Sequence, residues 1–202
     1  MYNNVIEFYI MANNLKKVVR TGWVEVGIPN EKVESVADHI YGTLILSLAI
    51  ISEKKLDVDV EKIFKMILIK ELYKGVSNKE ESIISSNKAD NKKELVERVL
   101  SKLATSGELL SIYDEYDSQK TKEAKFAKQV CKLESDIQAK IYEKNGDFTI
   151  ENAKEDIKNY PEDVKSQITE IKHASDGWLI FDRAYYYDDF FMNFSKEIEE
   201  ME

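Results

Sequence analysis

The sequence predicts an all-α protein, and three observations support that prediction. Apolar residues recur at helical spacing along most of the chain, and no segment shows the alternation of apolar and polar residues that is typical of a half-buried strand. Only 2 prolines and 7 glycines interrupt the 202 residues, which favours long helices joined by short turns. We expect a single domain over residues 1–202, because a chain of this length buries a sufficient core without disulfides or a structural metal.

Charge and composition narrow the possible partners and the compartment. The net charge is −9 and no basic face is evident, so we expect no binding to nucleic acid. Cys131 is the single cysteine, which excludes an internal disulfide and favours a reducing compartment. The longest mostly apolar run, Leu44–Ile51, is far shorter than the roughly 20 residues of a membrane helix, and the apolar segment Ile6–Ala12 lacks the basic start of a secretory signal. These features predict a cytoplasmic protein without a membrane anchor.

Three helices are expected in the first part of the chain. The first covers residues 3–19 and is followed by a loop over residues 21–32 that contains Gly22, Gly27 and Pro29. The second begins at Glu34 or Ser35, and the third runs from Asp57 or Asp59 to about Lys74, since a carboxylate there accepts a bond from a free backbone N–H. The second helix carries an apolar stripe at i, i+4 spacing that predicts its core face: Val36, Ile40, Leu44, Leu48 and Ile51.

The rest of the chain begins with a polar stretch, residues 75–91, that predicts a loop. Further helices are expected over residues 92–104, 108–116 and 120–144. Asn145 and Gly146 end the longest of them, because both tolerate the left-handed conformation of a helix C-terminus. Two or three helices then complete the chain within residues 150–202, where Pro161 suits a first helical turn.

Three short segments resemble the HD-domain family of 5′-deoxynucleotidase-like phosphohydrolases. They are Arg-Thr-Gly-Trp at residues 20–23, Glu-Ser-Val-Ala-Asp-His at residues 34–39 and Glu-Ala-Lys-Phe-Ala-Lys-Gln at residues 123–129. The resemblance is strongest over residues 15–143 and implies an HD-domain helical bundle. It also implies a metal-dependent hydrolase of nucleoside monophosphates, and a homodimer.

The family's metal site is bound by a histidine on one helix, a His-Asp pair on the next and an aspartate on a later long helix. A glutamate just after the His-Asp pair assists proton transfer, and the metal supplies a water of lowered pKa. The resemblance places His39 at the first ligand. It places Lys70 and Glu71 at the His-Asp pair, Lys74 at the assisting glutamate and Cys131 at the last aspartate.

These substitutions predict that the metal site is degraded. A protonated lysine has three donors and no lone pair, so Lys70 cannot act as a ligand, and its charge repels a divalent ion nearby. We therefore expect no bound metal; if the family chemistry persists, the ligands would be His39, Glu71 and Cys131. The alternative interpretation of Cys131 is a small buried thiol in the protein core.

The lysines have two readings. In one, Lys70 is paired with a nearby carboxylate and binds nothing. In the other, Lys70 and Lys74 join Arg20, Trp23 and His39 in a pocket for a nucleotide or another phosphorylated small molecule, and the pocket is the predicted ligand-binding site.

Three functions follow from these readings, and the sequence leaves all of them open. The first is a divergent HD-domain protein with lost or much reduced hydrolysis that binds a phosphorylated small molecule. The second is an active phosphohydrolase with a site rebuilt around His39, Glu71 and Cys131. The third is a structural protein that dimerises through the aromatic residues near its C-terminus: Tyr185, Tyr186, Tyr187, Phe190, Phe191 and Phe194.

Overall fold

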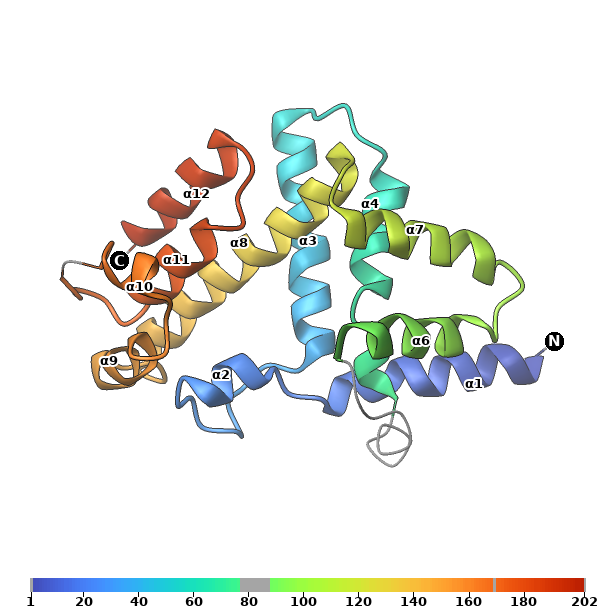
Figure 1. Ribbon diagram of the computed structural model, residues 1–202, viewed down its shortest axis with the longest axis horizontal. Coiled ribbons are helices and arrows are strands. Elements are labelled where there is room, and N and C mark those ends of the chain that lie inside the picture. The colour runs from blue at the N-terminus through green and yellow to red at the C-terminus, as the bar shows by residue number, and fades with distance from the viewer. Residues whose placement is uncertain (1, 77–87, 169, 202) are drawn as a thin grey trace. The chain divides into compact units, whose positions relative to one another are not determined.

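The computed structural model describes residues 2–76, 88–168 and 170–201, and these residues form helices joined by turns (Figure 1). The described part contains no strand, and a single isolated bridge pairs Val19 with Ser35. The all-α prediction is confirmed. The chain divides into two compact units. Unit 1 comprises the residues up to Val19 together with Ser35–Ala127. Unit 2 comprises Arg20–Glu34 together with Lys128–Glu202. The expectation of a single domain stays a prediction.

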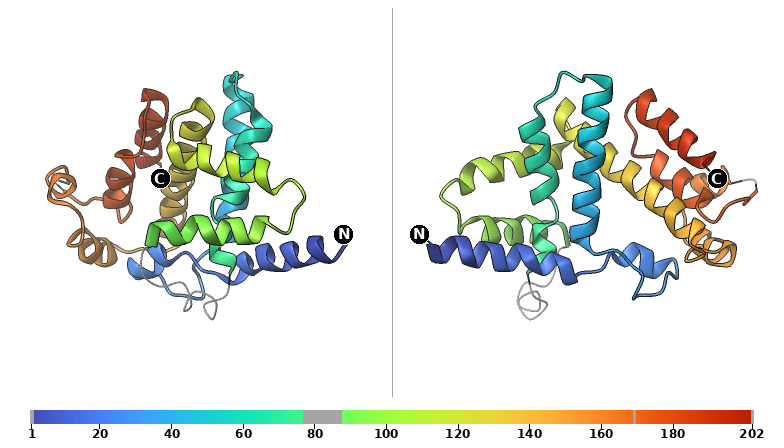
Figure 2. Two further views of the ribbon diagram at one scale, coloured as in Figure 1. Left: turned by 45° about the vertical axis from the view of Figure 1, so that its right-hand side comes forward. Right: turned by 180° about the vertical axis from the view of Figure 1, so that it is seen from behind.

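Unit 1 is built from helices α1 (Tyr2–Asn13), α3 (Val36–Lys54), α4 (Val60–Ile69), α6 (Lys88–Leu100) and α7 (Ser106–Ser118), with the 3₁₀ helices η1 (Asn14–Lys17) and η2 (Leu72–Gly75). α4 packs against α3 and α7, and α6 packs against η2, α7 and α1. Both views in Figure 2 show α6 beside α1. The most deeply buried side chains of these helices form the core of the unit, among them Ile63, Met66, Ile67, Val96, Val99 and Leu100.

The start of α3 follows directly from its sequence. The Ser35 hydroxyl accepts a bond from the Asp38 backbone N–H at 3.1 Å, and the Asp38 carboxylate accepts one from the Ser35 N–H at 2.9 Å. This capping box satisfies two backbone donors that a helix N-terminus leaves without partners. In the same way, the Asp59 carboxylate accepts from the Lys62 N–H at 3.0 Å and begins α4. Both predicted helix starts are confirmed.

α3 passes a test of length and composition for a membrane span, although α3 lies within the packed helices of unit 1. Its buried face is partly polar and includes His39, Thr43 and Ser47. Two of these hydroxyls donate to carbonyls one turn earlier: Thr43 to the His39 carbonyl and Ser47 to the Thr43 carbonyl, each at 2.7 Å. Because the helix backbone satisfies these hydroxyls, they can be buried at little cost, and we assign α3 as the core helix of unit 1.

Unit 2 contains α2 (Thr21–Glu25), the greater part of α8 (Lys122–Lys144), α9 (Ile150–Ile157), α10 (Glu162–Lys165), α11 (Asp176–Arg183) and α12 (Asp189–Glu199). α11 packs against α9 and α12. α8 ends as predicted, with Gly146 at a φ of +74°. Near the N-terminal end of α11, the Trp178 ring stacks on Trp23 of α2 with a centroid distance of 4.1 Å.

Several predicted boundaries are wrong. The first helix gives way to η1 at Asn14, the expected loop at residues 21–32 contains α2, and the third helix ends at Ile69, before Lys74. The predicted apolar stripe of α3 is wrong at Leu48, which is 50% exposed, whereas Val36, Ile40 and Ile51 are buried as expected. Among the described residues, four helices follow α8 where two or three were expected. Pro161 is the N-cap residue of α10 and so precedes the first helical turn. Of the loop expected at residues 75–91, residues 77–87 lie outside the described residues, and α6 already begins at Lys88.

Candidate functional site

Two of the residues that the resemblance places at the family's metal ligands, His39 and Lys70, lie at helix ends in unit 1. His39 is on the first turn of α3, where its backbone N–H donates to the Ser35 carbonyl at 3.1 Å, and it is 4% exposed. Lys70 is the C-cap residue of α4, and its side chain is likewise 4% exposed. The Lys70 Nζ lies 3.3 Å from His39 Nε2. The structure therefore brings a lysine amine directly against the one retained ligand of the family pattern.

Glu71 neutralises part of the lysine charge. Its Oε1 lies 3.1 Å from the Lys70 Nζ, and its Oε2 lies 2.9 Å from the Lys74 Nζ. Burial alone would raise the pKa of Glu71, but the charges of Lys70 and Lys74 outweigh it and lower that pKa to about 2. The carboxylate is thus ionised at neutral pH. The expected pairing of Lys70 with a nearby acid is present.

His39, Lys70 and Glu71 by themselves do not make a suitable ligand set for a divalent metal. An ammonium at hydrogen-bond distance donates to the imidazole nitrogen, and it occupies the lone pair that a metal would need. The same charge a few ångströms from the imidazole would repel a cation. Glu71, the remaining oxygen donor of this cluster, is already held by two lysines.

Arg20 and Trp23 form a second cluster, in unit 2, around Glu34. The Arg20 Nη1 donates to Glu34 Oε1 at 2.6 Å, and the Trp23 Nε1 donates to the same oxygen at 2.8 Å. The Arg20 Nη2 donates to the Ser135 hydroxyl at 2.9 Å, and Nη1 lies 3.9 Å from a Glu134 oxygen. Trp23 is fully buried between Trp178 and Tyr142. Arg20 is thus fixed by acids and a hydroxyl.

Cys131 lies on α8 one turn before Ser135, and the Ser135 hydroxyl donates to its carbonyl at 3.1 Å. Cys131 is buried and forms no disulfide, in agreement with the prediction of a small buried thiol. Glu134 and Ser135 on the same helix are also buried.

The predicted pocket residues accordingly fall into two sets. His39, Lys70, Glu71 and Lys74 lie together in unit 1, whereas unit 2 holds Arg20, Trp23 and Cys131. That all of them line one cavity stays a prediction. Glu34 was not predicted as the partner of Arg20 and Trp23, although it begins the second of the three family-like segments. The opposite charges of Arg20 in the first segment and Glu34 in the second were the signal available for it.

Comparison with known proteins agrees with this architecture. A sequence profile described as an HD domain matches residues 12–172. The 5′-deoxynucleotidase HDDC2 of Dictyostelium discoideum is 31% identical over 152 residues, which cover 70% of this chain and 79% of that protein. A conserved hypothetical protein from Pyrococcus furiosus has a solved structure with a TM-score of 0.56 and 30% identity, over 70% of this chain and 83% of the other.

A further solved structure, described as a predicted metal-dependent phosphohydrolase from Magnetospirillum magnetotacticum MS-1, covers 98% of this chain and 91% of its own. Its TM-score is 0.59 at 14% identity, which shows a shared fold and no more. Together, the profile and the relatives place the chain in a class of all-helical HD domains. The chain belongs to the HD-domain family of 5′-deoxynucleotidase-like phosphohydrolases.

Proposed function

We propose that this protein is a divergent HD-domain member that has lost, or greatly reduced, metal-dependent hydrolysis and that binds a phosphorylated small molecule without a metal. The observation that carries the proposal is the Lys70 Nζ at 3.3 Å from His39 Nε2. A cation stands where the family pattern requires a neutral imidazole ligand, so the charge that would have come from the metal comes from the chain itself.

The chemical class of the ligand follows from charge and from the relatives. Lys70 and Lys74 bring two amines to the neighbourhood of His39 and Glu71, and charge-assisted hydrogen bonds to phosphate are among the stronger contacts of an ammonium. The Dictyostelium relative is named as a 5′-deoxynucleotidase. We therefore expect a nucleoside monophosphate or a similar phosphate ester as the ligand.

A binding titration tests this proposal. Deoxynucleoside monophosphates are titrated into the protein in excess chelator and followed by calorimetry. We expect saturable binding that weakens with added salt and is lost in Lys70→Glu. The control Lys165→Glu changes a lysine of α10 that pairs with Glu162, and it should leave binding nearly intact. Equal binding by wild type and Lys70→Glu would contradict the proposal.

Similar experiments would also identify the two alternative functions, an active hydrolase with a rebuilt site and a structural dimer. Phosphate release that depends on added cobalt or manganese, and is abolished by His39→Ala, would favour a site with His39, Glu71 and Cys131 as ligands. A protein that binds no monophosphate and elutes as a dimer would favour the structural role. A homodimer and a cytoplasmic location stay predictions.

A further inference from the structure

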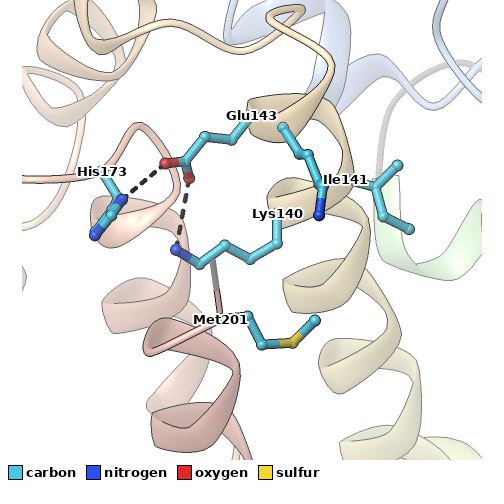
Figure 3. Close-up of a pocket in the computed structure, with 6 residues that line it drawn as sticks. Lys140, Ile141, Glu143, His173 and Met201 are labelled. Atoms are coloured by element: carbon cyan, nitrogen blue, oxygen red, sulfur yellow. Dashed lines mark hydrogen bonds and ion pairs between the residues drawn. The ribbon is translucent and has the colours of Figure 1, made fainter.

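Unit 2 contains a cavity of about 170 Å³ beside the last two turns of α8 (Figure 3). Its volume is several times the share of about 30 Å³ that one water molecule takes in the liquid. Four of its lining residues come from α8, and the other two come from the segment before α11 and from the end of the chain: Lys140, Ile141, Glu143, Lys144, His173 and Met201. None of them belongs to the clusters around His39 or Arg20.

Lys140 is the unusual member of this lining. It is 7% exposed, and its Nζ is buried without a hydrogen-bond partner among the described residues. The nearest acid oxygen is Glu143 Oε2 at 3.7 Å, which is an ion pair but too long for a hydrogen bond. A lysine amine carries three donors, and burying them without acceptors is costly. Within the described part of the chain, the fold thus retains a buried lysine amine that forms an ion pair but no hydrogen bond.

Glu143 does not supply that acceptor, because its oxygens are used elsewhere. Its Oε1 lies 3.0 Å from His173 Nδ1, and its Oε2 accepts from the Ser175 hydroxyl at 2.6 Å and from the Ser175 N–H at 3.2 Å. Figure 3 shows the carboxylate turned toward His173, with the Lys140 amine below it. Lys140 and Lys144 both bring lysine amines to the lining of this cavity.

We propose that this cavity is a binding site for a small oxyanion, phosphate or carboxylate, that accepts hydrogen bonds from Lys140. Lys144 adds charge at the exposed rim of the cavity, and His173 contributes a ring nitrogen on the opposite side. Ile141 and Met201 provide apolar contacts, which favour an anion with a short hydrocarbon part over a bare one. The site is independent of the proposed function because the two share no residue.

The test is a titration of the whole protein with inorganic phosphate, acetate and butyrate at constant ionic strength, followed by calorimetry and by NMR of the His173 ring. We expect saturable binding at one site per chain, with butyrate several-fold tighter than acetate. Lys140→Met removes the charge and keeps most of the stem, and it should weaken binding at least tenfold. The matched control Lys154→Met, on an exposed position of α9, should bind as the wild type does.

Two further variants keep the result interpretable. Lys144→Met changes an exposed position, so it should fold normally and should weaken binding several-fold even if Lys140→Met disturbs folding. Lys70→Glu should leave this binding unchanged, which separates a failure here from a failure of the proposed function. The absence of saturable binding by the wild type, or equal affinities of the wild type and both cavity variants, would overturn the site and leave ordered water as the partner of Lys140.

Discussion

Lys70 places a lysine amine in contact with His39. The amine also pairs with Glu71, and the resemblance predicts that the family has an acceptor at this position. The sequence predicted this exchange from the family-like segments alone. It could not predict that Glu71 would pair with both lysines, because that depends on the 3₁₀ turn of η2 after α4.

Glu71 gives a prediction about acid stability. Its folded-state pKa is about 2, against an ordinary value of 4.5, so the folded state favours the ionised form. The stabilisation is present above about pH 4.5 and is lost as the pH falls toward 2, and it amounts to roughly 3 kcal/mol. Urea unfolding of wild type and Glu71→Gln between pH 2 and 7 measures it. The two free energies of unfolding should converge at low pH; a constant difference would contradict the assigned charge pair.

Asp136 gives a prediction of opposite sign. Burial and the neighbouring Asp182 carboxylate raise its pKa well above the ordinary value. Its Oδ2 accepts from the Tyr186 hydroxyl at 2.7 Å and from the Ser195 hydroxyl at 2.8 Å, whereas its Oδ1 has no hydrogen-bond partner in the described structure. A raised pKa means that the folded state holds a proton where the unfolded state does not, so stability falls as the pH rises through the folded-state pKa.

Asp136→Asn tests that sign, since an amide imitates the protonated acid. The variant should gain stability relative to wild type as the pH is raised from 4 to 8, measured as the difference in free energy of unfolding. A wild type that gains relative to the variant over this range would show that Asp136 is ionised in the folded protein.

At the scale of helices, the sequence predicted the first residues of α3 and α4 more accurately than the buried face of α3 or the end of α4. Ser35 and Asp59 begin their helices through bonds between residues three apart, which local sequence determines. The predicted face of α3 failed for a geometric reason. A helix has 3.6 residues per turn, so each step of four residues moves the side chain about 40° further around the helix axis. After the three steps from Val36 to Leu48, the side chain therefore no longer faces the core.

The buried face of α3 includes Thr43 and Ser47, which polarity alone would place outside. Only the hydrogen bonds of their hydroxyls within the helix explain their burial. The pattern of polar and apolar residues carries no information about such bonds, so the buried face of α3 could not be predicted from that pattern.

Gly75, at the end of η2, provides an element-scale prediction. A Cβ at this position would lie 2.4 Å from the backbone carbonyl oxygen of Met11 in α1, which cannot move aside as a side chain would. Gly75→Ala should therefore destabilise the protein by about 1–3 kcal/mol. Gly107→Ala in α7 is the control: a Cβ there meets no atom within 4 Å, so alanine should stabilise the helix by roughly 0.5–1 kcal/mol. Urea unfolding measures both, and similar values for the two variants would contradict the close approach.

At the scale of the whole molecule, the family resemblance predicted the class of fold, and the HD-domain match over residues 12–172 confirms it. The resemblance could not indicate how the described helices divide, because the residues 20–34 are grouped with the C-terminal part of the chain. Nor did it point to the cavity at Lys140, since that lysine lies outside the three family-like segments.

Restoring the family pattern tests whether the rest of the site is intact. Lys70→His, Glu71→Asp and Cys131→Asp together should confer metal affinity that the wild type lacks, because they supply the missing imidazole and carboxylate donors. Cobalt titration followed by visible absorbance measures the gain. A folded triple variant that binds no cobalt would show that the residues which orient the ligands have also changed.

Metal content of the purified protein tests the central claim most directly. The protein is prepared without chelator and without a metal-affinity tag, and cobalt, manganese, zinc, iron and nickel are quantified by mass spectrometry. Because Lys70 holds a cation's place beside His39, we expect far less than one equivalent of any of these metals per chain, together with negligible hydrolysis of deoxynucleoside monophosphates. One equivalent of metal per chain, lost in His39→Ala along with metal-dependent phosphate release, would contradict the account.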